Sequence, residues 1–233
     1  MCSRNHRSRI VSKIFEVPIF PLPNVVFFPK TLLPLHIFET RYRIMVQDAL
    51  SGKNKIAMVL LKEGWEKNYF GCPAVYSVGC VGDIQFSELL TDGKYNIMLY
   101  GLHRIKIIKF LQNEPYRIAR VKSLQDAHFD LEHFNEKVEA ENFIFLVRRY
   151  LKEMGIKNVD EYLRVKVQTH SLESIMNHVA TFLDLTVYEK QELLEMDSLQ
   201  MRYLKLKQHV ENRLMAVTVA KRVKFVPEDP RLN

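Results

Sequence analysis

The densest group of side chains that could bind a metal lies near the middle of the chain, at Asp126, His128, Asp130 and His133. Imidazole and carboxylate groups bind several divalent metals. The same spacing also fits a polar turn in which Asp130 caps the next helix, because a side-chain oxygen there accepts from unpaired backbone N–H groups. We favour the turn, since the zincin pattern H-E-x-x-H does not occur. No metal or other cofactor is expected.

Nucleophilic and nucleotide chemistry have poorer candidates. Cys80 could act as a nucleophile only with a lowered thiol pKa beside a base, but its segment alternates polar and apolar residues, which favours a small buried side chain. A phosphate-binding loop needs G-x-x-x-x-G-K-[ST]. The Gly-Lys pairs at residues 52–53 and 93–94 lack both the upstream glycine and the following hydroxyl residue. The sequence therefore predicts a protein that is not an enzyme.

Three aromatic residues, Trp65, Tyr69 and Phe70, stand on a short segment between Gly64 and Gly71. Exposed aromatic rings are good binding anchors, because they supply a large contact area at low entropic cost. The alternative is that the rings fold back as a lid over the strands, and the two interpretations have equal weight. We take the three residues as the candidate peptide-binding surface.

Basic residues outnumber acidic ones, which gives a net charge of +7. Part of the excess forms a basic tail over residues 1–13, and part lies on residues 201–224, where Arg202, Lys205 and Arg213 mark a basic face. Such a charge run usually forms a solvated helix surface. The alternative is a contact with an acidic partner, a nucleic acid or a membrane surface.

Hydrophobic periodicity predicts strands over most of residues 14–125, in apolar or alternating segments such as 55–61, 79–86, 95–101 and 103–110. The two glycines of the second segment indicate a bulge or a close backbone approach. One helix is expected at about residues 40–50. His36 should be a core residue or hold a backbone group at the start of this helix, while Glu39 and Arg41 should make local contacts there.

After Asp126 the apolar spacing changes to that of helices. Helices are expected at about residues 131–154, 172–183, 186–196 and 198–224, with a capping box between Thr186 and Glu189. Pro227 and Pro230 end the last and longest helix. The predicted class is therefore α+β, with a strand lobe over 14–125, a helical lobe over 126–225 and a C-terminal tail over 226–233.

Three segments carry a family resemblance. They are the proline-interrupted run over 17–42, the turn, strand, glycine and basic residue over 92–105, and the helix junction over 183–195 with its E-K-Q-x-L-L pattern. Together, and in this order, they resemble the amino-terminal domain of Lon proteases. The resemblance implies a PUA-like β pseudobarrel followed by a helical bundle with a long last helix. It also implies binding of unfolded or tagged polypeptide, and it carries no catalytic residue.

We expect the chain to be similar to stand-alone bacterial Lon-domain proteins, which lack the ATPase and protease modules. The predicted function is a non-catalytic module that binds unfolded or exposed apolar polypeptide and is linked to ATP-dependent proteolysis, with a protease or chaperone as a further partner. The alternative is an RNA-binding PUA-like protein, by analogy of fold and because the net charge is +7. Three cysteines, no secretory signal and no membrane span predict a cytoplasmic protein.

Overall fold

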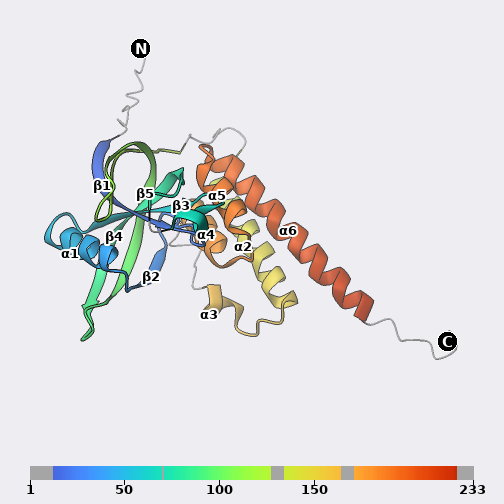
Figure 1. The fold of residues 1–233 in the computed structure, drawn as a ribbon. Coiled ribbons are helices and arrows are strands. Elements are labelled where there is room, and N and C mark those ends of the chain that lie inside the picture. The colour runs from blue at the N-terminus through green and yellow to red at the C-terminus, as the bar shows by residue number, and fades with distance from the viewer. Residues whose placement is uncertain (1–12, 70, 127–133, 164–170, 225–233) are drawn as a thin grey trace, which may run out of the picture. The chain divides into compact units, whose positions relative to one another are not determined.

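The computed structural model describes residues 13–69, 71–126, 134–163 and 171–224. The chain divides into two compact units, the first ending at Gln125 and the second beginning at Asp126. This boundary coincides with the change in hydrophobic period. Figure 1 shows strands and one helix in the first unit and helices in the second.

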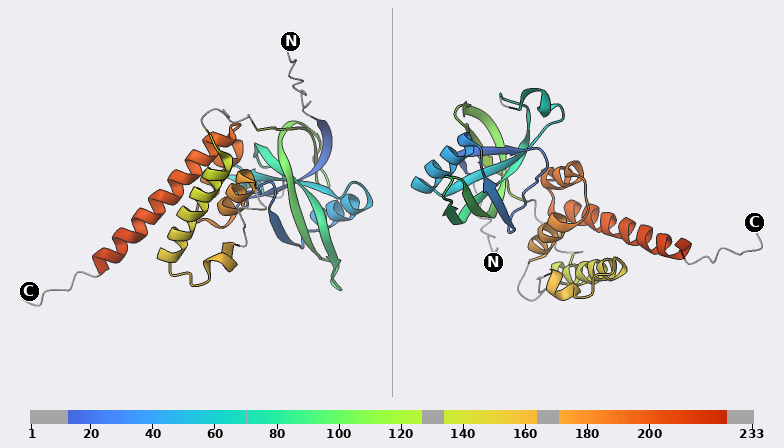
Figure 2. Two further views of the ribbon diagram at one scale, coloured as in Figure 1. Left: turned by 180° about the vertical axis from the view of Figure 1, so that it is seen from behind. Right: turned by 60° about the horizontal axis from the view of Figure 1, so that its bottom comes forward.

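The first unit is a ring of strands with one strand added at its edge. Its elements are β1 (Ile14–Leu22), β2 (Leu32–Ile37), α1 (Thr40–Ser51), β3 (Lys55–Leu61), the 3-10 turn η1 (Trp65–Asn68), β4 (Val75–Leu89), β5 (Tyr95–Gln112) and β6 (Arg117–Ser123). The sheet order is β2-β5-β4-β3-β1-β6, and an additional pairing of β5 with β6 closes the ring. The views in Figure 2 show the curvature of these strands. The predicted pseudobarrel is confirmed.

Close backbone packing explains two of the glycines in the long strands. A Cβ on Gly79 would lie 2.2 Å from the Met58 carbonyl oxygen, and one on Gly101 would lie 2.2 Å from that of Phe28. The register of β4 against β5 also shifts between Val81 and Gly82. Both the bulge and the close approach expected from the sequence therefore occur.

Apolar side chains form two clusters on opposite faces of the strands, as the alternation of a strand requires. One cluster takes residues from all five strands of the ring: Val17, Ile19, Ala57, Val59, Val81, Ile105, Ala119 and Val121. The other packs beneath α1, which contributes Tyr42, Met45, Val46 and Ala49, and it includes Cys80. Cys80 is fully buried, as predicted.

The second unit is helical. Its elements are α2 (Glu136–Glu153), α3 (Val159–Leu163), α4 (Leu172–Phe182), α5 (Val187–Glu195) and α6 (Leu199–Lys224). The last helix has 26 residues and is the long helix drawn in red in Figure 1. Within the described ranges, no helix is both long enough and apolar enough to cross a membrane.

Helix caps confirm one expectation and correct another. Thr186 and Glu189 form the predicted capping box at the start of α5. The first helix of this unit begins later than expected, because the side chain of Asn135 accepts from the N–H groups of Lys137 and Val138. Asp130, the expected cap, lies outside the described residues. The short helix α3 was not predicted.

Candidate functional site

The aromatic segment folds as the short turn η1 between β3 and β4. Gly64 has a positive φ of 81°, which glycine adopts without strain, and this conformation starts the turn. Trp65 and Tyr69 are each half-buried, and their rings meet edge to face at 5.5 Å between centroids. Phe70, the third predicted residue, lies outside the described part of the chain.

Tyr69 connects this turn to the start of α1. Its hydroxyl donates a hydrogen bond to Glu39, and the Arg41 guanidinium lies over its ring, 5.2 Å from the centroid. Arg41 also donates to the Tyr69 carbonyl oxygen at 3.4 Å and to Glu39 at 3.0 Å. The predicted local contacts of Glu39 and Arg41 are therefore confirmed, and they extend to the aromatic turn.

The environment of Tyr69 keeps its hydroxyl protonated. Burial and the neighbouring Glu39 carboxylate raise the pKa of this phenol, since both disfavour a second negative charge. Beside it, burial raises the pKa of Tyr42 to about 12. Both phenols therefore stay protonated at neutral pH, and that of Tyr69 donates a hydrogen bond. We call Glu39, Arg41, Trp65 and Tyr69 the Tyr69 cluster.

An apolar recess of about 110 Å³ opens beside the Tyr69 cluster. Phe38, at its edge, is 60% exposed, which is unusual for a large aromatic residue. The recess, called the apolar recess below, is lined by Phe20, Leu22, Leu35, His36, Ile37, Phe38, Glu39, Tyr42 and Tyr69. Apart from His36 and Glu39, the lining is aliphatic or aromatic.

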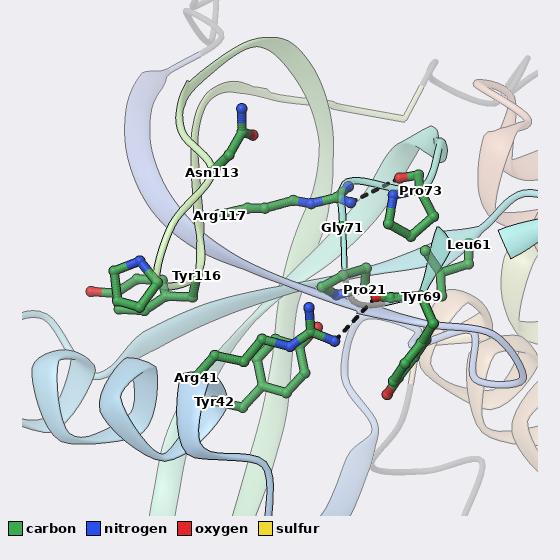
Figure 3. Close-up of a pocket in the computed structure, with 11 residues that line it drawn as sticks. Pro21, Arg41, Tyr42, Leu61, Tyr69, Gly71, Pro73, Asn113, Tyr116 and Arg117 are labelled. Atoms are coloured by element: carbon green, nitrogen blue, oxygen red, sulfur yellow. Dashed lines mark hydrogen bonds between the residues drawn. The ribbon is translucent and has the colours of Figure 1, made fainter. Parts of the chain in front are cut away.

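A second, narrower recess shares Tyr42 and Tyr69 with the first and is shown in Figure 3. It contains two guanidinium groups, those of Arg41 and Arg117. Arg117 is 7% exposed and donates to the Pro73 carbonyl oxygen at 2.9 Å. Its lining, which defines the arginine recess, is Pro21, Arg41, Tyr42, Leu61, Tyr69, Gly71, Pro73, Asn113, Pro115, Tyr116 and Arg117.

His36 does not have the expected role. Its ring is exposed, and its Nδ1 atom lies 2.8 Å from the Asn96 Oδ1 atom on β5. The ring also stacks against Phe38 at 6.4 Å. The prediction that it holds a backbone group is wrong, because β2 is an edge strand on which alternate side chains face solvent.

The candidates for metal binding are not brought together within the described residues. There, no three His, Cys, Asp or Glu side chains form a group that could hold a metal ion. Asp126 forms an ion pair with Arg202, and His128, Asp130 and His133 lie outside the described ranges.

The three residues of the predicted basic face, all on α6, have partners inside the second unit. Arg202 is only 2% exposed and pairs with Asp126, so it does not belong to an exposed basic face. Burial is possible because a carboxylate offsets its charge. Lys205 lies 3.0 Å from Glu192, and Arg213 donates to the Asp184 carbonyl oxygen at 2.7 Å. A role for Lys205 and Arg213 in binding an acidic partner stays a prediction.

Solved structures share this fold. The N-terminal domain of a Mycobacterium avium complex Lon protease matches with a TM-score of 0.65 at 15% sequence identity, over 84% of this chain and 98% of that one. A Lon N-terminal domain protein from Xanthomonas campestris matches with a TM-score of 0.56 at 19% identity and the same coverage. The ring of strands followed by helices is thus the fold of Lon N-terminal domains.

Sequence comparison then gives the family. The model of the ATP-dependent protease La (LON) substrate-binding domain matches residues 16–212, so the chain belongs to this family of substrate-binding domains. The Lon protease of Dictyoglomus thermophilum is 28% identical over 213 residues, which is 89% of this chain and 26% of that protein. Lon protease 2 of Myxococcus xanthus is 29% identical over 203 residues, 84% of this chain and 23% of that protein. The chain spans about a quarter of the length of these curated relatives.

Proposed function

We propose that this protein binds unfolded or exposed apolar segments of other polypeptides through the Tyr69 cluster and the apolar recess, without catalysing a reaction on them. The observation that carries the proposal is an open apolar recess of about 110 Å³ with a 60% exposed phenylalanine at its edge. Membership of a substrate-binding family supports it. The cytoplasmic location and a link to ATP-dependent proteolysis, through a protease or chaperone partner, belong to the same proposal.

Different parts of this surface have different roles in the proposal: the recess supplies apolar contact, and Arg41 positions Tyr69. An apolar side chain of the bound segment would enter the apolar recess and pack against Phe38. Trp65, whose ring lies against that of Tyr69, would add contact area beside the recess. The hydrogen bonds and the cation–π contact of Arg41 hold Tyr69 in place before binding, so little further ordering is needed. A surface that binds apolar side chains, whatever the surrounding sequence, can bind many different polypeptides.

RNA binding, the alternative from the sequence, has less support. Of the three residues of the predicted basic face, Arg202 is buried and Lys205 and Arg213 already have acceptors in the second unit. Affinity for RNA falls steeply as salt rises, because counterions are released on binding. Apolar capture of polypeptide should change little between low and moderate salt, which separates the two functions.

The direct test is Trp65→Ala, assayed with a permanently unfolded client such as reduced and carboxymethylated lactalbumin. Removal of the indole should weaken binding by about tenfold, the usual effect of losing an aromatic anchor. The melting temperature should stay unchanged, since Trp65 is only half-buried. Fluorescence anisotropy of the labelled client measures the first quantity and calorimetry the second.

Phe145→Ala is the matched control, because Phe145 is a 71% exposed aromatic residue on α2, in the other unit. Its loss should leave client binding unchanged. Equal losses of affinity in both variants, or a fall in stability that accounts for the loss in Trp65→Ala, would refute the assignment of the surface.

A further inference from the structure

A larger cavity lies in the first unit where strands β1 and β3 separate. Their parallel pairing runs from Ile19 opposite Ala57 onward. Before that point β1 pairs with β6, and β3 pairs with β4. Pro18 has no N–H to offer a neighbouring strand at this position. The cavity here has a volume of about 350 Å³, within the range of small-molecule sites, and shares only Tyr116 with the arginine recess.

One side of this cavity is apolar and rigid. The Phe15 ring lies edge to face against the His103 ring, with centroids 5.9 Å apart. Tyr116 is 7% exposed, and its hydroxyl donates to Asp48 at 2.7 Å. The rings of Phe15 and Tyr116 therefore offer flat surfaces that are already held in place.

The lining also carries positive charge. Lys13, Lys53 and Lys55 all line the cavity. The two carboxylates of the lining are already engaged: Glu16 pairs with Arg120 at 2.7 Å, and Asp48 accepts from Tyr116. Among the residues that the structure describes, no carboxylate lies within ion-pair distance of the three ammonium groups.

The charge of the lysines affects the pKa of His103, the histidine of the lining. Burial, followed by the positive charges of Lys55 and Lys13, lowers the pKa of His103. Its Nε2 atom is buried and has no hydrogen-bond partner within the described ranges. His103 is therefore neutral at neutral pH, and the positive potential around it comes from the lysines.

We propose that this cavity binds a small organic anion, with its charged group among Lys13, Lys53 and Lys55 and its apolar ring against Phe15. The inference goes beyond the proposed binding of polypeptide, since it concerns a different cavity and a different class of ligand. Both parts of the ligand are needed: the lysines attract the charge, while the aromatic wall excludes water and supplies contact area.

Three probes separate the two parts in a titration of the full chain followed by NMR. Phenyl phosphate carries both the charge and the ring, inorganic phosphate only the charge, and benzyl alcohol only the ring. Phenyl phosphate should bind at least about tenfold more tightly than either of the others. Affinity for inorganic phosphate equal to that for phenyl phosphate, or no saturable binding of phenyl phosphate, would overturn the proposal.

Charge-neutral variants locate the bound probe. Lys55→Gln and Lys13→Gln should each weaken phenyl phosphate by about fivefold, because one attractive charge is lost at a partly solvated site. Lys106→Gln is the matched control, since Lys106 is exposed and points to the opposite face of the same strand as His103. Equal effects in all three variants would indicate unspecific attraction and refute the site.

The pKa of His103 gives a readout that does not depend on affinity. A bound anion offsets the charges of Lys13 and Lys55, so saturating phenyl phosphate should raise this pKa, while Trp65→Ala should leave the response unchanged. NMR titration of the imidazole signals measures it. Binding of phenyl phosphate without any change at His103 would show that the probe lies elsewhere.

Discussion

The two units of this protein use their charged and aromatic side chains in different ways. In the first unit, Arg41 and the lysines of the larger cavity lie at openings to solvent, beside aromatic rings. In the second, the basic residues of α6 are largely occupied by partners within the unit, as in the pairs of Arg202 with Asp126 and of Lys221 with Glu153.

A run of charged residues in a sequence therefore does not by itself mark the part of the molecule that is open to a partner. The basic run of α6 is conspicuous in the sequence, yet Arg202, Lys205 and Lys221 all have carboxylate partners within the helical unit. The Tyr69 cluster contributes little to the net charge, yet it borders two open recesses. Three experiments test the contrast, starting with the largest expected effect.

Arg202→Ala should destabilise the second unit by about 3 kcal/mol, because it removes one partner of a buried ion pair and leaves Asp126 without its cation. Lys205→Ala removes the ion pair with Glu192, whose side chains are 34% exposed for Lys205 and 49% for Glu192. It should lower the free energy of unfolding by less than about 0.5 kcal/mol. Urea denaturation followed by far-UV circular dichroism measures both free energies of unfolding.

If the two substitutions cost the same, Arg202 has no structural role different from that of a surface lysine, and the contrast between the units fails. Client binding adds a second comparison, since neither substitution should weaken it in protein that is still folded. A loss of client binding in folded Lys205→Ala would restore a binding role to α6.

Tyr69→Phe should have an intermediate effect. It keeps the ring beneath Arg41 and removes only the hydroxyl that donates to Glu39, so the aromatic turn loses part of its anchoring. Loss of one such hydrogen bond to a charged group costs about 1.5 kcal/mol, and we expect client affinity to fall by about fivefold. Anisotropy measures the affinity. Unchanged binding would mean that the position of the turn does not matter for capture.

Acidification should have the smallest effect and should act on both units. Burial lowers the pKa of His103 in the first unit and of His209 in the second, where the opposing Glu189 is outweighed. Each histidine therefore binds a proton at a higher pH in the unfolded chain than in the folded one. As the pH drops below about 6.5, protons bind preferentially to the unfolded chain, and the free energy of unfolding should fall. Denaturation at about pH 7.5 and pH 5.5 tests this. His209→Gln should remove the part of the pH dependence that comes from the second unit. Greater stability at the lower pH would contradict the assignment.

Hydrophobic periodicity predicted most of the fold. Alternating segments became strands, and the change of period near Asp126 marks the boundary between the units. The start of α2 was misjudged because apolar spacing at residue 131 continues the helical pattern, whereas the cap that begins the helix is Asn135. The five-residue α3 was missed, since so short a helix has too few turns for its spacing to stand out.

The site was predicted only in part. The short segment between two glycines predicted Trp65 and Tyr69 as candidates. The two recesses could not be predicted in this way, because their linings combine residues far apart in the sequence, such as Phe38 and Arg117. The burial of Arg202 depends on Asp126, 76 positions earlier, and spacing along one helix carries no such information. The apolar run that contains Phe38 was noticed for its likeness to a family, and its exposure becomes evident only in three dimensions.

The pairing of β1 with β6 has a consequence for how the protein is made. Arg120 on β6 meets Glu16 on β1, 104 positions earlier in the chain. During synthesis β1 leaves the ribosome well before β6 exists, so the ring cannot close until almost the whole first unit has emerged. Strand partners this distant slow folding, because a long loop must be ordered before the contacts form. In the meantime the apolar strands are open to chaperones and to neighbouring nascent chains.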